Sequence, residues 1–159
     1  MATTIDVVEF QLGKEHYALD IQLAREIVEM MPITPLPRAP AYIAGIINLR
    51  GEITNILNLN SLLGLHDGET AENQKIIVLV PEAAGGSNVG IIVDDVSSVR
   101  QVAEDEIDAM DDAASSAAYV KGIIKLGAED EGDGRDTDRT DLIIWLDVQR
   151  LLQEQVATT

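Results

Sequence analysis

The sequence predicts an all-β fold, either a barrel or a sandwich, because short apolar runs follow one another along almost the whole chain. The runs are roughly four to eight residues long, rich in Ile, Val and Leu, and often separated by Gly, Pro, Asn or Asp. Strands joined by short connections argue against βαβ units. The expected strands are 5–12, 16–21, 25–30, 45–49, 52–59, 75–80, 89–96, 97–102, 119–126 and 141–147.

Helical segments are few. Asp147 is placed to cap a C-terminal helix over 148–155, in which Val148, Leu151 and Leu152 share one face. The other short features are a hairpin turn at 12–15, one helical turn at 39–43 with Pro near its start, one short helix entered through 58–61, and a hairpin loop at 81–87 that opens no helix.

An internal repeat supports this fold class. Tyr, Gly, Ile, Ile and Leu stand in register in two stretches, and two further pairs of blocks follow the same order in both halves. The paired blocks are 42–49 with 119–126, 53–63 with 142–152 and, more weakly, 17–27 with 89–99.

The repeat predicts two small barrels, one over about 1–68 and one over about 72–156. An exchange of terminal strands between the two subdomains is left open. Because a domain of about 60 residues buries only a modest part of its surface, we expect the two halves to share a core.

The second half has an acidic insertion, GAEDEGDGRDTDRTD, at 127–141. Its Asp and Gly content resembles a Ca²⁺-binding loop, but the helix–loop–helix setting and the terminal Glu of an EF-hand are missing. We therefore interpret 127–141 as a solvated surface loop.

The charge balance limits the choice of partners. With 28 acidic and 11 basic residues, the net charge is −17, which disfavours nucleic acid and anionic membranes. Because molar salt shortens the Debye length to about 3 Å and screens such self-repulsion, the composition favours a halophilic protein over an ordinary acidic one. Melting temperatures at low and multimolar salt separate the two, and salt-indifferent stability contradicts the halophilic interpretation.

The sequence gives little support for catalysis or a bound cofactor. It contains no Cys, two distant His residues and none of the common nucleophile, phosphate-binding or zinc-protease motifs. We expect no cofactor and no metal, and we hold a small β-barrel enzyme as the least favoured alternative. No apolar run is long enough to span a membrane, and the N-terminus lacks signal-peptide features, so a cytoplasmic location is expected.

The best candidate anchor for a protein partner is Arg50, in the stretch NLRGEI at 48–53. It stands between two apolar runs, beside Gly45 and Gly51, which permit tight turns or close approach of a backbone. The structural alternative is that Arg50 pairs with an internal carboxylate such as Glu26 or Glu52. The repeat favours a further role, because the second half has no Arg at the equivalent place.

The expected strands and the segments between them, taken in their order along the chain, resemble the CheW family of chemotaxis coupling proteins. The resemblance runs from about Ile5 to Leu152, and its most specific part is LPRAPAYIAGIINLRG at 36–51. It implies two SH3-like, five-stranded barrels packed around a common core, in agreement with the repeat.

The resemblance also implies a non-enzymatic adaptor that couples the cytoplasmic tips of chemoreceptors to the regulatory domain of the histidine kinase CheA, in membrane-associated receptor arrays. The same module in a different receptor–kinase assembly is the alternative. The positions that the resemblance implicates in partner contact are Glu26, Gly45, Arg50, Val89 and Val96.

Three positions depart from the pattern of many family members. Ala24 replaces a Val, which shrinks one apolar contact, and Asn55 and Asn58 replace Pro and Asp. Since Asn can still cap the following turn, we expect the fold to be kept.

Overall fold

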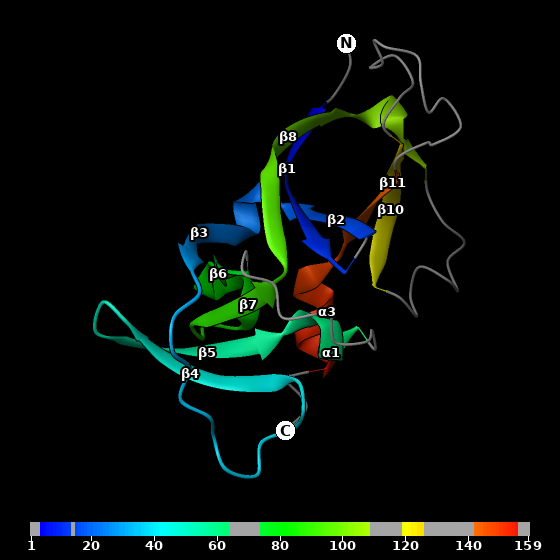
Figure 1. Cartoon of the computed structure of the whole chain (residues 1–159). Coiled ribbons are helices and arrows are strands. Elements are labelled where there is room, and N and C mark those ends of the chain that lie inside the picture. The colour runs from blue at the N-terminus through cyan, green and yellow to red at the C-terminus, as the bar shows by residue number, and fades with distance from the viewer. Residues whose placement is uncertain (1–3, 14, 64–73, 109–118, 126–141, 156–159) are drawn as a thin grey trace.

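The computed structural model of the chain describes residues 4–13, 15–63, 74–108, 119–125 and 142–155. Within these residues strands predominate and form two sheets, with only short helices between them (Figure 1). The predicted all-β class is therefore confirmed. The acidic segment 127–141 lies outside the described residues, so its interpretation as a surface loop stays a prediction.

The first sheet has six strands in the order β8-β1-β2-β11-β10-β9. All neighbours are antiparallel except β11 and β2. The short 3₁₀ helix η3 (Glu104–Glu106) joins the two edge strands, so the sheet curls round on itself (Figure 1). The strand bounds are β8 (Asp95–Ala103), β1 (Thr4–Leu12), β2 (Glu15–Asp20), β11 (Leu142–Leu146), β10 (Val120–Lys125) and β9 (Ile107–Asp108).

The second sheet has five strands in the order β3-β6-β7-β5-β4, and only β5 and β7 are parallel. Thr34 forms a β-bridge with Ile46 and so takes the place that the two-residue β9 has in the first sheet. The strand bounds are β3 (Ala24–Glu29), β6 (Lys75–Leu79), β7 (Val89–Val93), β5 (Glu52–Asn58) and β4 (Ile43–Leu49).

Neither sheet corresponds to one half of the sequence. The first sheet combines β1 and β2 with strands from the C-terminal half, and the second sheet runs from 24 to 93. The predicted boundary between 68 and 72 therefore does not separate the sheets. The reason is that β2 pairs in parallel with β11, and β5 with β7, and parallel pairs require long crossover connections.

The repeat reappears in the pairing of the strands. Gly45 on β4 pairs with Ile56, and Gly122 on β10 pairs with Trp145, in each case directly after a register shift. The weaker third pair of blocks, 17–27 and 89–99, is also equivalent in the structure. Gly90 on β7 lies opposite Ile56, and Ala18 on β2 lies opposite Trp145, the counterpart of Ile56.

The helix that follows each repeated hairpin begins in the same way. The backbone N–H groups of Asn58 and Asp147 donate to the carbonyls of Tyr42 and Tyr119, both at 2.7 Å. The side chain of each cap accepts a hydrogen bond from the backbone N–H three residues further on. The helices are α1 (Leu59–Leu62) and α3 (Val148–Gln155), so the predicted C-terminal helix and its cap are confirmed.

Two of the short predicted features differ from the structure. Residues 39–43 form a turn, closed by a 3.0 Å hydrogen bond from Ile43 N–H to the Pro40 carbonyl, and β4 begins at once. The 81–87 hairpin loop was predicted to open no helix, but it begins with a 3₁₀ helix, η2 (Pro81–Ala84). In both cases Pro favours the first turn of helical geometry, and the adjoining strands limit its length.

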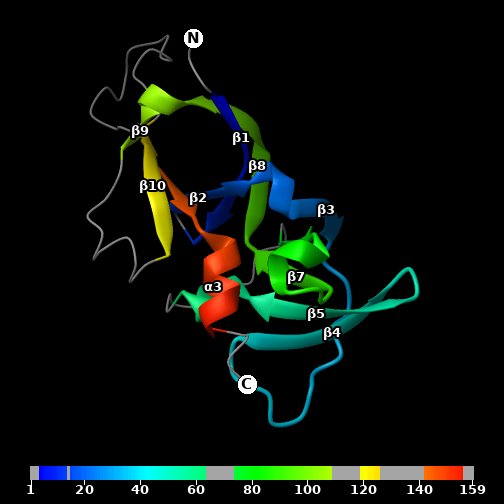
Figure 2. The same cartoon turned by 180° about the vertical axis from the view of Figure 1, so that it is seen from behind.

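Three apolar clusters hold the sheets together. The largest lies between the two sheets, with α3 packed at their junction (Figures 1 and 2), and it includes Phe10, Leu19, Ile91, Leu146 and Leu151. Smaller clusters fill the inner face of each sheet. The shared core that the repeat predicts is thus present. It holds the second sheet, whose β4–β5 turn carries Arg50, in a fixed position relative to the first sheet.

Candidate functional site

Arg50 lies in a two-residue turn between β4 and β5. Leu49 pairs with Glu52, and the two residues between them have positive φ angles, 52° at Arg50 and 89° at Gly51. Positive φ at both central residues is the signature of a type I′ hairpin turn. The side chain of Asn48 stabilises this turn by accepting a 2.9 Å hydrogen bond from the Gly51 N–H.

Arg is an unusual residue for this conformation. The left-handed region costs a non-Gly residue about 1–2 kcal/mol, and type I′ turns normally use Asn or Gly at the first central position. The backbone therefore gives no reason for an Arg at position 50.

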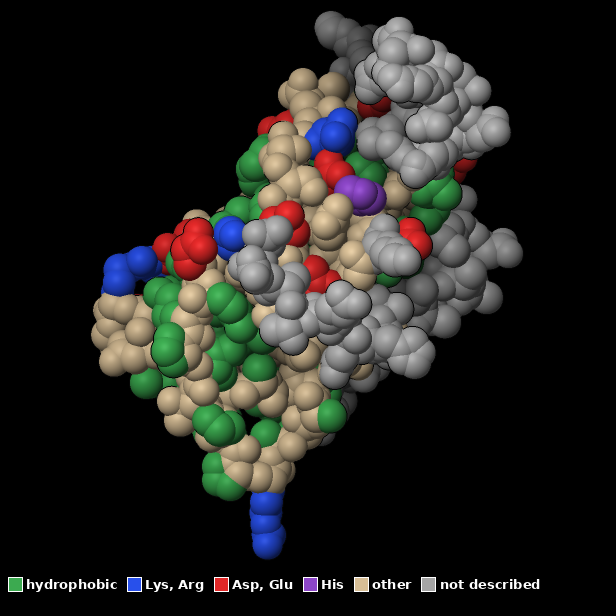
Figure 3. Space-filling model, in the orientation of Figure 1, with side chains coloured by type: hydrophobic (Ala, Val, Ile, Leu, Met, Phe, Trp, Pro, Cys, Tyr) green, Lys and Arg blue, Asp and Glu red, His purple; other side chains and the backbone are tan. Residues whose placement is uncertain are grey.

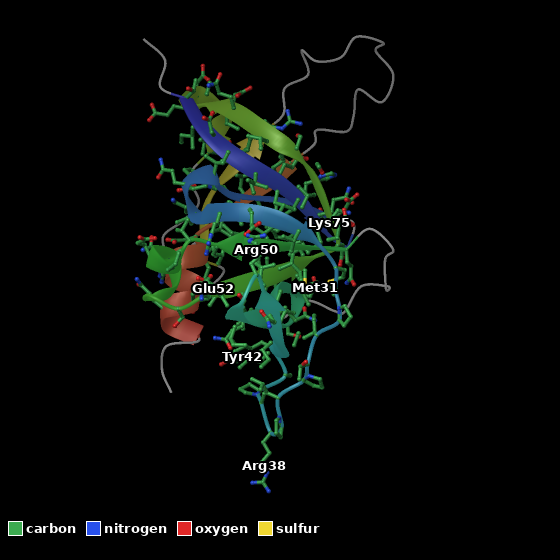
Figure 4. The ribbon with its side chains drawn as sticks, turned by 90° about the vertical axis from the view of Figure 1, so that its left-hand side faces the viewer. Met31, Arg38, Tyr42, Arg50, Glu52 and Lys75 are labelled. Atoms are coloured by element: carbon green, nitrogen blue, oxygen red, sulfur yellow. The ribbon has the colours of Figure 1, made fainter. Side chains whose placement is uncertain are left out.

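The side chain of Arg50 reaches across to β3, where its guanidinium forms an ion pair with Glu26. A register shift between Ala24 and Glu26 separates Arg25 from the strand pairing, and Arg25 forms a second ion pair with Glu52 at 3.6 Å. We call these four residues, Arg25, Glu26, Arg50 and Glu52, the paired-charge surface. Figure 4 shows Arg50 and Glu52 on the side of the molecule where β3 meets the β4–β5 hairpin.

The sequence left open that Arg50 pairs with an internal carboxylate, either Glu26 or Glu52. The structure confirms the pairing with Glu26, whereas Glu52 pairs with Arg25. The side chain of Arg50 is 62% exposed and that of Glu26 is 24% exposed. An ion pair this open to solvent contributes about 1 kcal/mol or less to stability. The pair therefore offsets at most the strain of the turn, and a strained residue without a net structural gain is a candidate for function.

Two exposed apolar side chains stand on the strands that carry the paired-charge surface. Ile27 follows Glu26 on β3, Ile53 follows Glu52 on β5, and both are exposed. Figure 3 shows hydrophobic side chains gathered over the part of the molecule where Figure 1 places β4 and β5. Apolar side chains around a few Arg-containing polar contacts are typical of protein–protein interfaces.

The structure gives Gly45 a packing role. Its φ is 145°, and a Cβ at this position would lie 2.2 Å from the carbonyl oxygen of Thr34. Gly122, its counterpart in the repeat, is crowded less severely: a Cβ there would lie 2.8 Å from Ile107 Cγ2 and 3.2 Å from the Asp108 carbonyl oxygen. The close approach of the bridging segment explains Gly45, which is buried in the second sheet.

The two predicted valines lie in different surroundings. Val89 on β7 is 5% exposed and belongs to the core between the sheets, so packing accounts for it. Val96 on β8 is half-buried and packs against the same core. The structure thus brings Glu26 and Arg50 together, whereas Gly45 and Val89 support the fold.

The residues that the structure describes contain no cluster of His, Asp or Glu side chains able to hold a metal ion. None of the helices among them is both long and apolar enough to cross a membrane. What the site offers chemically is charge pairing and apolar contact on a solvent-exposed surface.

Two curled sheets around one core, with a charged and apolar contact surface on the second, define an interaction module of two SH3-like subdomains. The chain matches the model of the CheW-like domain over residues 6–156. It therefore belongs to the CheW-like domain family.

Individual relatives agree with this assignment. The chain is 30% identical over 155 residues to the chemotaxis protein CheW of Treponema pallidum, covering 94% of this chain and 82% of that protein. It is 28% identical over 149 residues to the chemotaxis protein CheW of Thermotoga maritima, covering 94% and 88%. The crystal structure of the scaffolding protein TtCheW from Thermoanaerobacter tengcongensis is similar, with a TM-score of 0.73, 30% identity and coverage of 91% and 89%.

Proposed function

We propose that this protein is an adaptor of chemotaxis signal transduction that couples chemoreceptors to a histidine kinase. Its family consists of scaffold proteins, and its fold matches one of them along nearly the whole chain. The observation that carries the residue-level proposal is the paired-charge surface, where Arg50 adopts a strained turn for an ion pair of little structural value.

The proposed receptor contact uses Arg50 and Glu26 together. The aliphatic part of Arg50 can lie on apolar neighbours such as Ile53, while its guanidinium divides its hydrogen bonds between Glu26 and a receptor carboxylate. A receptor tip is a helical hairpin, and its apolar face fits a surface of exposed Ile side chains with a charged border. Ala24 offers less apolar area here than the Val that the family resemblance implies at this position.

The remaining parts of the proposal concern partners and location. The kinase partner is CheA, which is contacted through its regulatory domain, and the complex forms in the cytoplasm at membrane-associated receptor arrays. We assign no catalytic activity to the chain itself, because its sequence offers no nucleophile–base set. Val96, half-buried at the start of β8, is kept as a contact residue of lower priority.

A binding experiment with purified components at high salt tests this function. The wild-type protein is expected to form a ternary complex with a soluble receptor-tip fragment and CheA, and to raise receptor-dependent kinase activity. Arg50→Glu places two carboxylates side by side and is expected to abolish receptor binding without unfolding the protein.

Lys125→Glu is the matched control, because Lys125 is an exposed, ion-paired cation on the equivalent strand of the first sheet. It is expected to bind both partners like the wild type. A wild-type protein that binds neither partner contradicts the adaptor function, and normal coupling by Arg50→Glu contradicts the assignment of Arg50.

A further inference from the structure

A second strained arginine lies in the segment between β3 and β4. Arg38 has a φ of 60° at the centre of a turn with Pro37. In a type II turn this position is normally Gly or Asn, after Pro. Of the described residues, Arg38, Arg50 and Tyr119 are those other than Gly with positive φ.

The loop that carries Arg38, residues 35–41, is held at both ends. On one side, Thr34 and Ile46 exchange two backbone hydrogen bonds of 2.9 Å, and on the other Ile43 donates to Pro40. Pro35, Pro37 and Pro40 restrict the backbone between these anchors. A loop restrained in this way loses little conformational entropy when it binds a partner.

Arg38 differs from the other cations that the structure describes. Six others form ion pairs with carboxylates, and Arg150 lies over the ring of Tyr119. Arg38 has no carboxylate partner among the described residues, and its side chain points away from the body of the molecule (Figure 4). The six ion-paired cations are Arg25, Arg50, Lys75, Arg100, Lys121 and Lys125.

The tip of this loop offers one cation surrounded by exposed apolar groups. Pro35, Leu36 and Pro37 are exposed beside Arg38. In a chain with a net charge of −17, a lone Arg does not make a phosphate-binding surface, which needs several cations. A carboxylate on an otherwise apolar protein surface is complementary to it, because Arg forms two parallel hydrogen bonds with a carboxylate.

The loop and the paired-charge surface lie at opposite ends of β4. The strand runs from Ile43, next to the loop, to Leu49, next to Arg50. At about 3.3 Å per residue the two ends of this strand lie about 20 Å apart. Two different proteins can therefore occupy them at once, as an adaptor requires.

We propose that the 35–41 loop is a second docking surface, at which Arg38 binds a carboxylate of the kinase partner while the paired-charge surface holds the receptor. This inference rests on the proposed function. It makes Arg38 a residue that discriminates between the two partners rather than a structural element of the turn.

The test compares Arg38→Gly with the wild type by titrating each against the isolated regulatory domain of CheA and, separately, against a soluble receptor tip. Glycine keeps the positive φ and removes the side chain, so the variant is expected to fold at least as stably. Affinity for the kinase domain should fall about tenfold or more, with receptor affinity within about twofold of the wild type.

Salt provides a readout that a purely structural role of Arg38 does not move. Over the salt range in which melting curves show both proteins to be folded, the wild-type affinity for the kinase domain should weaken as salt rises, because the Debye length shortens to about 3 Å at about 1 M. The affinity of Arg38→Gly for the kinase domain should weaken less with salt, and that of Arg38→Lys should keep part of the salt dependence.

Equal kinase affinity of Arg38→Gly and the wild type overturns the inference while leaving the adaptor function in place. Loss of receptor binding instead of kinase binding also overturns it. A wild-type protein that binds neither partner overturns the proposed function, and the inference with it.

Discussion

Inside the first sheet, β1 carries Glu9 at the position where the second sheet has Val78 on β6. The match follows from the pairing, since Glu9 lies opposite Ala18 and Val78 lies opposite the equivalent Gly90. Likewise β8 carries Arg100 where β3 carries Val28.

Glu9 lies close to two side chains, those of Arg100 and His16. Glu9 is 4% exposed, and Arg100 Nε donates to one of its carboxylate oxygens at 2.9 Å. His16 Nδ1 lies 3.0 Å from the other oxygen. The equivalent interior of the second sheet is an apolar cluster that includes Ile47, Ile56 and Val78.

The features that both copies of the repeat share are those that the duplicated fold requires. Both copies keep the close-packed glycine, the polar helix cap and the register shift. Their interiors differ in chemistry, and the sequence of the second copy has no Arg at the position equivalent to Arg50. Features that differ between the copies, such as the Arg50 turn and the Glu9 network, are therefore not demanded by the shared architecture.

The largest effect is expected at the shared glycine. Gly45→Ala should lower the free energy of unfolding by about 4 kcal/mol or more, because its Cβ would collide with the Thr34 carbonyl in a backbone conformation that favours Gly. Gly122→Ala should cost about 1–3 kcal/mol, since its closest contact is the methyl group of Ile107 at 2.8 Å. Denaturant unfolding measures both, and equal losses contradict the difference in crowding.

The next largest effect concerns the charged interior. Arg100→Val leaves the buried carboxylate of Glu9 with His16 alone and should cost about 2–3 kcal/mol. The double variant Glu9→Val/Arg100→Val copies the second sheet and should lie within about 1 kcal/mol of the wild type. Urea unfolding at neutral pH checks this, and a double variant as unstable as the sum of the single variants Glu9→Val and Arg100→Val shows that the two residues are not coupled.

The smallest effect is expected at Tyr17, whose counterpart is Val89. Burial, and then the neighbouring Glu15, raise the pKa of Tyr17 above its ordinary value of 10.0. Because the folded pKa is raised, its contribution to stability is complete below about pH 10 and is lost as pH rises through the folded pKa. Tyr17→Phe should therefore lose less stability than the wild type between about pH 10 and pH 12 in unfolding measurements; parallel curves contradict this contribution.

Sequence reasoning predicted the local structure well, and physical causes explain why. Strand positions follow from β-branched runs, and the caps at Asn58 and Asp147 follow from local hydrogen bonding. The sheet composition did not follow from the repeat, because similarity between segments shows which are equivalent and leaves open which strand each one pairs with. The parallel pairs β2–β11 and β5–β7 decide that question.

At the candidate site, the sequence singled out Glu26 and Arg50, which the structure brings together in an ion pair, but it could not separate packing from contact. From the sequence alone, Gly45 and Val89 are candidates for the site. Their packing roles follow only from the structure, in which the Thr34 carbonyl lies against Gly45 and Val89 is buried. Arg38 was missed as a separate candidate, although Pro37 followed by a residue other than Gly could have drawn attention to a strained turn.

Receptor binding through Arg50 is tested by the variant Arg50→Asn, with stability and receptor binding measured on the same preparation. Asn suits the first position of a type I′ turn, so the free energy of unfolding should stay within about 1 kcal/mol of the wild type or rise. Affinity for a soluble receptor tip should fall about tenfold or more. Unchanged affinity, with Lys125→Asn as the matched control, would show that Arg50 does not bind the receptor.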